Sequence, residues 1–229
     1  EGITLEGLRQ ANLKLLYLNS SSGGYHGHPI KQQRRLEIIE YARANQVYII
    51  EDDHNGELKF NTKPIDAMSK LDNDHIIYIG SFSKLLLPSI RISYMALPNQ
   101  LVQLFYEKSR DYHQTASKLE QLALAMYVED GQLARHLKRL RKHYRNKSTH
   151  LLQKLRTTFP QHKFELYETS LKITMAIKAD LVDQYIALAK QNDILVNKNS
   201  NNQITLSFSG ILDQDIDEAV DRLKEIWIN

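Results

Sequence analysis

Short apolar runs alternate with helical patterns along the first hundred residues, and the runs predict strands. Strands are expected at residues 15–20, 47–53, 76–81 and 92–97. Because consecutive positions are apolar, these strands fit a largely parallel sheet that is buried on both faces. Helical spacing over residues 30–46 predicts a helix between the first two strands, and a short helix is expected near residues 65–71. The last two strands are too close in sequence for a helical crossover, so we expect one antiparallel strand or a skipped neighbour.

The second half of the chain changes from helices to a mixed pattern. Residues 99–158 show helical spacing, and Pro160 marks the end of that region. Strands are then expected at residues 163–168, 171–178, 193–198 and 203–208, with helices at 181–192 and 213–228. Asp213 is the predicted N-cap of the last helix. The pattern indicates an α/β domain at residues 1–145, followed by a small α+β domain at residues 146–229.

Composition limits the class of protein. The chain has 229 residues, 42% of them hydrophobic and 25% charged, which is typical of a soluble globular protein rather than a disordered one. A net charge of +3 is too small to indicate nucleic acid or a membrane as the partner. Because there is no cysteine, disulfides and thiolate metal sites are excluded. No apolar stretch approaches the roughly 20 residues of a membrane span, and no signal peptide is recognisable, so we expect a cytoplasmic protein without a membrane partner.

Three of the predicted strands end in polar clusters. These are residues 19–22 with the glycines that follow, residues 51–54, and residues 81–84. Ligands of open α/β sheets bind beyond the carboxyl ends of the strands. Taken singly, each cluster is better explained by structural ion pairs or by solvated loop charges. Three clusters at equivalent strand ends favour a ligand site instead.

The second and third clusters carry the groups that pyridoxal phosphate (PLP) requires. That cofactor needs a lysine to form a Schiff base and a carboxylate to keep its pyridine nitrogen protonated. It also needs hydroxyls and an arginine for its phosphate, because a guanidinium offers forked donors. Lys84 can supply the amine and Asp52 the carboxylate. Ser81 and Ser83 can supply the hydroxyls, and Arg91 the guanidinium.

Residues 47–97 resemble the aminotransferase-like domain of MocR/GabR-type transcriptional regulators, a branch of the fold-type I PLP enzymes. The segments VYIIEDDHNGEL and IIYIGSFSKLLLPSIRISYMALP carry the resemblance, which continues through residues 119–147 and 213–223. It implies a fold-type I PLP-dependent aminotransferase-like fold. The chain would contribute an incomplete large domain with a mostly parallel sheet, together with the small C-terminal α+β domain.

The resemblance also implies roles for single residues. Lys84 matches the Schiff-base lysine, Asp52 the partner of the pyridine nitrogen, and Arg91 a phosphate-contacting arginine. Ser81 stands where a threonine or serine assists the phosphate. His54 occupies the place of the tyrosine that contacts the cofactor's 3-hydroxyl, where an imidazole can also donate.

Other positions depart from the family pattern. The family's His-Gln pair is replaced within residues 19–27. Gly210 stands where amino-acid-sensing members carry an arginine that grips a substrate carboxylate. The winged-helix domain and the phosphate-cradling turn of such regulators have no counterpart in the sequence, so the resemblance implies a C-terminal portion of about half a regulator. PLP is expected in the intact protein, whereas this chain, without the phosphate-cradling turn, is expected to bind it poorly or not at all.

Three functions compete on this basis. The first is the effector-sensing and dimerisation domain of a helix-turn-helix (HTH) regulator, which would bind a small-molecule effector, form a homodimer and reach DNA through its N-terminal domain. The second is an active PLP-dependent aminotransferase acting on an amino acid, and the third is a scaffold for dimerisation alone. Lys84, Asp52 and Arg91 argue against the scaffold, whereas His54 and Gly210 weaken the enzyme. We therefore expect the regulator, and no enzymatic activity in this fragment.

Two further signals lead to no site. Residues 134–147 are rich in lysine and arginine, but their apolar positions follow helical spacing and predict an amphipathic helix with a solvated basic face. The nine histidines lack the spacing of a metal pair with an acidic third ligand, so no metal site is predicted.

Overall fold

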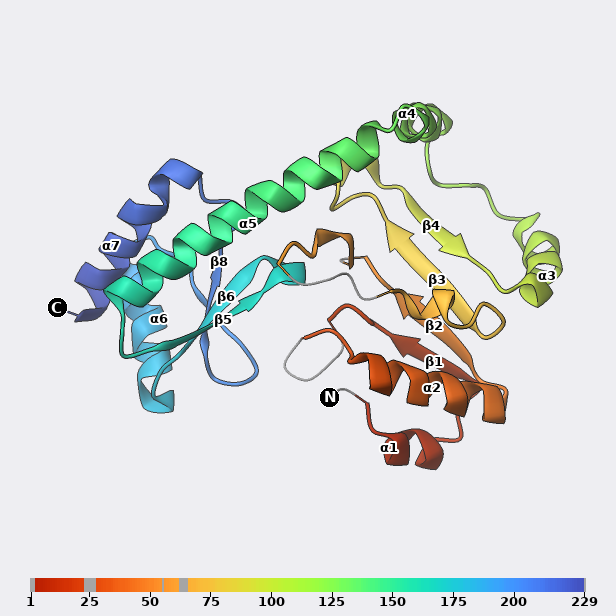
Figure 1. Cartoon of the computed structure of the whole chain (residues 1–229), viewed down its shortest axis with the longest axis horizontal. Helices are drawn as coiled ribbons and strands as arrows, with labels where there is room; N and C mark the ends of the chain where they lie inside the picture. The colour runs from red at the N-terminus through yellow and green to blue at the C-terminus, as the bar shows by residue number, and fades with distance from the viewer. Residues whose placement is uncertain (1–2, 23–27, 55, 62–65, 229) are drawn as a thin grey trace. The chain divides into compact units, whose positions relative to one another are not determined.

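The computed structural model describes residues 3–22, 28–54, 56–61 and 66–228. The chain divides into two compact units, residues 1–138 and 139–229. Each unit contains a four-stranded sheet, and most strands and helices of the two units are labelled in Figure 1.

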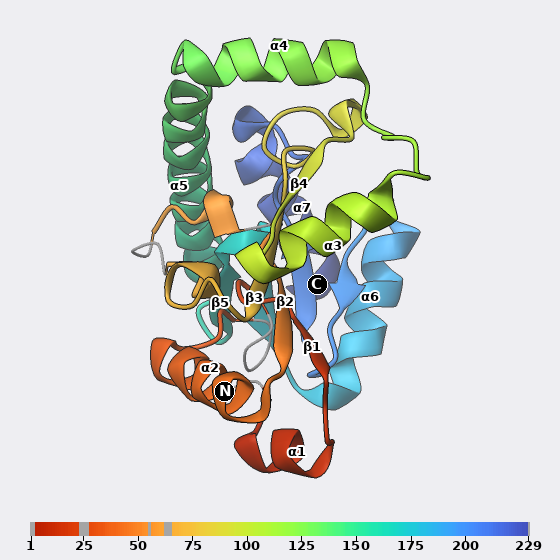
Figure 2. The same cartoon turned by 90° about the vertical axis from the view of Figure 1, so that its right-hand side faces the viewer.

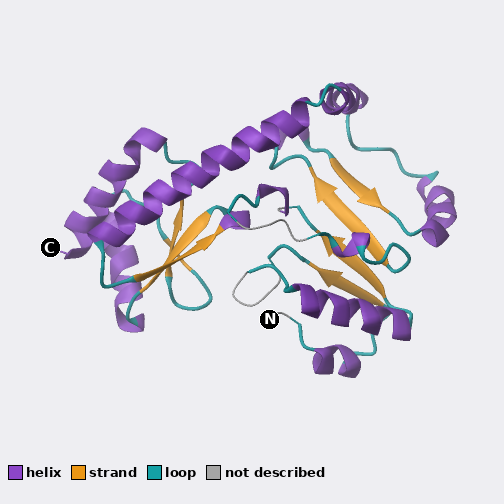
Figure 3. Ribbon diagram, viewed as in Figure 1, coloured by secondary structure: helices purple, strands orange, loops and turns teal. Residues whose placement is uncertain are grey.

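The sheet of the first unit has the strand order β1-β2-β3-β4 (Figure 3). Its strands are β1 (Leu15–Leu18), β2 (Tyr48–Asp52), β3 (Ile76–Ser81) and β4 (Ser93–Ala96). The first three strands run parallel, and β4 pairs antiparallel with β3. The prediction of a largely parallel sheet with one antiparallel strand is therefore confirmed.

Helices α1 (Leu5–Gln10) and α2 (Gln32–Asn45) lie together beside β1 and supply the core of the first unit (Figure 2). Thr4 caps α1, because its side-chain oxygen accepts a hydrogen bond from the backbone N–H of Gly7 at 3.1 Å. Gln46 ends α2 in a left-handed conformation. The core side chains come from the two helices and from alternate strand positions; among them are Leu8, Leu16, Leu18, Ile38, Ile39, Ala42, Ile49 and Ile76.

Only one face of β1 is covered by the described residues of this unit. Leu16 and Leu18 are buried, whereas Leu15 and Tyr17 are 51% and 60% exposed. All four residues of β4 are exposed. The expectation of burial on both faces is therefore wrong for β1 and β4. For β1 the reason is that Leu16 and Leu18 belong to the buried cluster that includes residues of α1 and α2, whereas Leu15 and Tyr17 point to the opposite face.

The predicted helical region at residues 99–158 consists of three helices. These are α3 (Asn99–Ser109), α4 (Lys118–Glu129) and α5 (Gln132–Thr158). Gly131, with a φ of 69°, turns the chain between α4 and α5. Leu151 and Leu155 are buried on one side of α5. Of the helices that the structure describes, none has the length and apolar character needed to cross a membrane.

The second unit has an antiparallel sheet in the order β5-β6-β8-β7. Its strands are β5 (Lys163–Tyr167), β6 (Lys172–Ala176), β7 (Asn197–Lys198) and β8 (Ile204–Ser207), and its further helices are α6 (Val182–Gln191) and α7 (Ile216–Ile228). Of the predicted strand at residues 193–198, the last two residues form a strand, β7. Its first residues instead close the end of α6, because the backbone N–H groups of Asp193 and Ile194 donate to Lys190 and Ala189.

Aromatic packing joins the two helices that are specific to the second unit. Trp227 of α7 stacks on Tyr185 of α6 with ring centroids 5.3 Å apart. The Trp227 indole N–H also donates to the Tyr185 carbonyl at 2.9 Å, so the buried donor is satisfied.

Asp213 does not cap the last helix, which corrects the sequence prediction. A 3-10 turn at Asp213–Asp215 precedes α7, and the N-cap of that turn is Leu212, which makes no side-chain hydrogen bond. The Asp213 carboxylate instead lies 3.5 Å from Lys147 Nζ and 3.6 Å from His143 Nδ1. Both partners belong to α5. The Asp213 carboxylate is therefore directed towards α5 rather than towards the backbone N–H groups at the start of α7.

Candidate functional site

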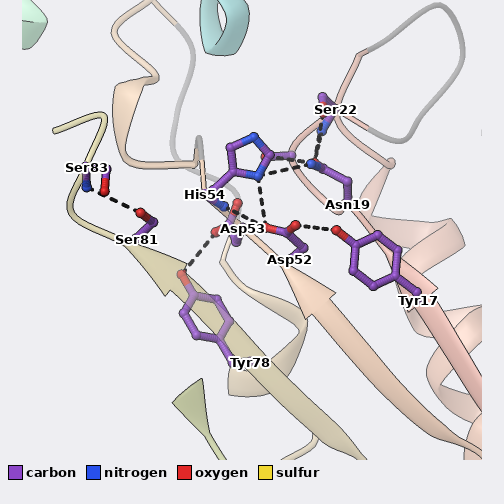
Figure 4. A network of polar contacts seen from close by, with 10 residues as sticks. Tyr17, Asn19, Ser22, Asp52, Asp53, His54, Tyr78, Ser81 and Ser83 are labelled. Atoms are coloured by element: carbon purple, nitrogen blue, oxygen red, sulfur yellow. Dashed lines mark hydrogen bonds and ion pairs between the residues drawn. The ribbon is translucent and has the colours of Figure 1, made fainter. Parts of the chain in front are cut away.

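The carboxyl ends of β1, β2 and β3 meet at one edge of the first unit's sheet. Asn19 follows β1, Asp52 ends β2 with His54 just beyond it, and Ser81 ends β3 (Figure 4). The strand register pairs Asp52 with Ile79, so these strand ends are close to level. The three polar clusters of the sequence therefore lie side by side, where open α/β sheets bind ligands.

Asp52 is held by two side chains, Tyr17 and His54, which together with it form a group that we call the carboxylate cluster. The hydroxyl of Tyr17 on β1 donates to Asp52 Oδ2. His54 Nδ1 lies 2.9 Å from Asp52 Oδ1, and the His54 backbone N–H donates to the same oxygen at 3.3 Å. Burial raises the pKa of the Asp52 carboxyl, but the hydrogen bonds from Tyr17 and His54 outweigh it and lower the pKa below its ordinary value. Asp52 is therefore ionised at neutral pH.

The contacts of His54 place a proton on its Nδ1. Nδ1 lies 2.9 Å from Asp52 Oδ1 and 3.4 Å from Asn19 Nδ2. An ionised carboxylate only accepts hydrogen bonds, so Nδ1 must donate to Asp52. The Asn19 amide nitrogen is also a donor, so its longer contact with Nδ1 is not a hydrogen bond.

Asn19 organises the turn that follows β1. Its Oδ1 accepts from the Ser22 backbone N–H at 3.0 Å, from the Ser22 hydroxyl at 2.8 Å and from the Ser21 hydroxyl at 3.1 Å. Such a side-chain-to-backbone bond is typical of an Asx turn. Residues 23–27, which include the predicted glycine pair, lie outside the described residues.

Asp53 differs from its neighbour Asp52 in its electrostatics. Its Oδ2 accepts from the Tyr78 hydroxyl at 3.4 Å. Burial, reinforced by the nearby Glu51 carboxylate, raises the pKa of Asp53.

Although three acidic residues are consecutive here, no group of three or more His, Cys, Asp or Glu side chains within the described ranges could hold a metal ion. Of the two aspartates, Asp52 has the lowered pKa that suits pairing with a cation.

The loop between β3 and β4 is closed at its base. Ser81 pairs with Ser93 at the end of the antiparallel ladder. One step further, the backbone N–H of Phe82 donates to the carbonyl of Ile92 at 3.0 Å. The intervening residues therefore form a compact connection with both ends fixed.

This loop carries the remaining predicted site residues. The Ser83 backbone N–H donates to Ser81 Oγ at 3.3 Å, so the two predicted hydroxyl residues lie together. Lys84 and Arg91 are exposed, and Arg91 has a left-handed backbone with a φ of 48°. The Ser81–Ser83 pair and the carboxylate cluster form separate groups in Figure 4.

A buried guanidinium supports the loops around the site. Arg35 of α2 is 1% exposed and donates to the carbonyls of Ile30 at 2.8 Å, Ser20 at 2.7 Å and Asp66 at 2.7 Å. Ser20 belongs to the turn after β1, and Asp66 precedes β3 along the chain. Burial lowers the pKa of Arg35, and the negative charge of the buried Glu51 carboxylate offsets part of that lowering. One side chain thus ties together segments from both sides of β2.

Sequence reasoning missed Tyr17 and Arg35, although each leaves a signal. Tyr17 lies two positions before Asn19, so the period-two rule of strands places both on one face. Arg35 precedes Ile38, Ile39 and Ala42 at helical spacing, which places a charged residue within the apolar stripe of α2.

A solved structure shares this fold. The α-aminoadipate aminotransferase LysN from Thermus thermophilus, in complex with N-(5'-phosphopyridoxyl)-L-leucine, matches 99% of the chain with a TM-score of 0.79 at 21% sequence identity. The match covers 62% of the LysN chain. The protein therefore has the fold of the fold-type I PLP aminotransferases, as the sequence predicted.

Curated proteins with similar sequences include transcriptional regulators. YdeL, an uncharacterized HTH-type transcriptional regulator of Bacillus subtilis (strain 168), is 31% identical over 238 aligned positions, and the alignment covers 99% of this chain and 51% of YdeL. MocR of Rhizobium meliloti, a probable rhizopine catabolism regulatory protein, is 32% identical over 145 residues, which are 63% of this chain and 29% of MocR. The chain spans about half the length of the curated relatives that it matches over 99% of its own length. The profile of the aminotransferase class I and II family matches residues 27–223, and the chain belongs to this family.

Proposed function

We propose that this chain is the effector-sensing, PLP-binding part of a MocR-type HTH transcriptional regulator. The observation that carries the proposal is the ionised Asp52 carboxylate, held at the end of β2 in a chain of the aminotransferase class I and II family. The matches to HTH-type regulators support a regulatory role. DNA binding would belong to an HTH domain, outside the part of these relatives that the chain matches.

The donor set fits PLP. An ionised carboxylate suits a protonated pyridine nitrogen, because each charge favours the charged form of the other. When bound, PLP supplies an aldehyde that reacts with amines and an electron sink for the carbon next to the nitrogen. Asp52 would pair with the pyridine nitrogen, and Lys84 would attach the cofactor. Arg91, Ser81 and Ser83 would hold the phosphate.

His54 would contact the cofactor in a restricted way. Its Nδ1 proton is already donated to Asp52 at 2.9 Å. A contact with the 3-hydroxyl would therefore have to come from Nε2, on the other side of the imidazole ring. The proposed role of His54 is thus divided between orienting Asp52 and touching the ligand.

An active aminotransferase is the second candidate function. The family match and the fold shared with LysN favour it. His54 and Gly210 stand where the resemblance implies a tyrosine and a carboxylate-binding arginine, and these changes favour sensing over turnover. The two functions differ in one measurable product, the keto acid that a transaminating enzyme forms from an amino acid.

Titration of the intact protein with PLP tests the proposal. We expect saturable binding with an absorbance band in the near-ultraviolet to visible range, and no keto acid when amino acids are added. Asp52→Asn should weaken binding on the order of tenfold to a hundredfold, because the amide cannot supply the charge-assisted hydrogen bond. Asp66→Asn, which changes a 64% exposed side chain, serves as the matched control. Absence of saturable binding would overturn the PLP assignment, and keto acid formation would favour the enzyme.

Gly210 leads us to expect weak recognition of simple amino acids. A Cβ added at Gly210 meets no atom within 4 Å, so a longer side chain can be accommodated there. Calorimetry should show weak binding of plain α- or γ-amino acids, and Gly210→Arg should gain about one to two decades in affinity, because a hydrogen bond to a charged group is worth roughly 1.5–3 kcal/mol. Gly210→Met is the control for length without charge. Sub-micromolar binding by the unaltered protein would contradict this expectation.

We infer that the intact protein is a cytoplasmic homodimer. Helices α3 and α4 expose large apolar side chains, namely Leu104, Phe105, Tyr106, Leu119, Leu122 and Met126. Exposed apolar patches of this kind mark interaction surfaces. Light scattering measures the mass, and a stable monomer at high concentration would contradict the inference.

A further inference from the structure

Tyr17 belongs to the site through a contact that crosses between strands. It lies opposite Ile50 in the parallel register of β1 and β2, and Asp52 follows Ile50 by two positions. Positions two apart on a strand share a face, so Tyr17 and Asp52 project from the same face of the sheet. Tyr17 reaches diagonally along that face, and its hydroxyl donates to Asp52 Oδ2 (Figure 4).

The hydrogen bonds on Asp52 are divided unevenly between its two oxygens. Oδ1 accepts from His54 Nδ1 at 2.9 Å and from the His54 backbone N–H at 3.3 Å. Oδ2 accepts from the Tyr17 hydroxyl. Each oxygen of a carboxylate offers about two acceptor sites. Counting donors from the described residues, both sites of Oδ1 are filled, whereas Oδ2 has one filled and one open. A ligand N–H would therefore approach Oδ2, next to the Tyr17 hydroxyl.

We propose that Tyr17 is a positioning residue that fixes the Asp52 carboxylate and leaves Oδ2 with one open acceptor site for the N–H of a cationic aromatic ring. The proposal rests on the proposed function, because the pyridinium ring of PLP is the cation that this site would take. Tyr17 acts through Asp52 and transfers no proton itself. Without its hydroxyl, the carboxylate gains freedom to rotate and water can occupy Oδ2.

The electrostatics of the pair agree with this geometry. The hydrogen bond to Asp52 raises the pKa of Tyr17, so the phenol remains a donor at neutral pH. Burial raises the pKa of Asp52, and the hydrogen bonds from Tyr17 and His54 are the contacts that lower it. Asp53, the next carboxyl along the chain, bonds to Tyr78 instead. Tyr17 and His54 are therefore the two groups whose removal should change the ionisation of Asp52.

Carbon-13 NMR of the Asp52 carboxyl tests the link without any cofactor. In Tyr17→Phe we expect the pKa of Asp52 to rise, whereas Tyr112→Phe, which changes a 79% exposed tyrosine just after α3, should leave it unaltered. Conversely, Asp52→Asn should lower the pKa of the Tyr17 phenol, as followed by ultraviolet titration. Because either partner reports the link, one misfolded variant does not prevent the test. An Asp52 pKa that stays the same in folded Tyr17→Phe would overturn the proposal.

PLP titration over a range of pH separates this proposal from the proposed function. Tyr17→Phe should bind PLP on the order of tenfold more weakly, the effect of one hydrogen bond to a charged group. Because binding needs ionised Asp52, the acid limb of the binding profile should also move to higher pH in this variant. If the unaltered protein binds no PLP, the proposed function is wrong, and PLP is also wrong as the ligand of Asp52 Oδ2. If it binds PLP and Tyr17→Phe matches it at every pH, the positioning role of Tyr17 is wrong while the proposed function stands.

Discussion

Replacing Lys84 by alanine is expected to abolish the covalent attachment of PLP to the intact protein. Lys84 is the only lysine in the loop between β3 and β4, next to the Ser81–Ser83 pair. Its side chain is exposed, so the truncation removes the amine without opening a cavity in the core. Borohydride reduction followed by peptide mass spectrometry measures the attachment. We expect complete loss of the trapped adduct in Lys84→Ala.

A second surface lysine provides the control for this experiment. Lys70 forms an ion pair with Asp66 at 2.7 Å, and both side chains are more than half exposed, so the pair contributes little to stability. Lys70→Ala should keep the full adduct on Lys84. An adduct that persists in Lys84→Ala would show that another amine attaches the cofactor.

Replacing Arg35 by methionine is expected to destabilise the first unit by about 3–5 kcal/mol, the usual loss when one partner of a buried charged network is removed. The three carbonyls of Ile30, Ser20 and Asp66 would lose their donor inside the protein. The Glu51 carboxylate, which is fully buried, would lose a favourable charge. Urea unfolding followed by circular dichroism measures the change in midpoint.

The neighbouring Arg34 is the matched control, because it lies on the same helix and pairs with Glu37 at 3.2 Å near the surface. Arg34→Met should change the stability by no more than about 1 kcal/mol. The single tryptophan, Trp227, belongs to the second unit, so its fluorescence reports that unit separately. Equal losses in Arg34→Met and Arg35→Met would show that the buried hydrogen bonds of Arg35 carry no special weight.

The strands and the acidic part of the site could be predicted from sequence because their signals are local. Four apolar runs mark β1 to β4, and the short spacing before β4 indicates its reversed direction. Asp52 and His54 are two positions apart, so their proximity needs no knowledge of the fold. Lys84 and Arg91 could likewise be placed on one loop, but their roles in binding stay predictions.

The parts that sequence reasoning missed depend on which segments meet in space. Tyr17 and Asp52 are 35 positions apart, and their contact follows from the register of two strands that apolar spacing alone does not specify. Arg35 sits in an apolar stripe, and only the carbonyls around it explain how its charge is accommodated. Local rules predict Asp213 as the cap of its own helix, whereas its carboxylate lies beside Lys147 and His143 of α5, a contact that depends on the fold.

Because its base is closed, the loop between β3 and β4 could be replaced as a single segment. Since both ends are pinned by the antiparallel ladder, the intervening stretch can be exchanged without shifting either strand along the other. Lys84 and Arg91 would be inherited together in any such exchange, whereas Asp52 belongs to a different segment and would stay with the host. Chimaeras that exchange residues 83–91 between family members would therefore transfer the Lys84 amine and the Arg91 guanidinium together.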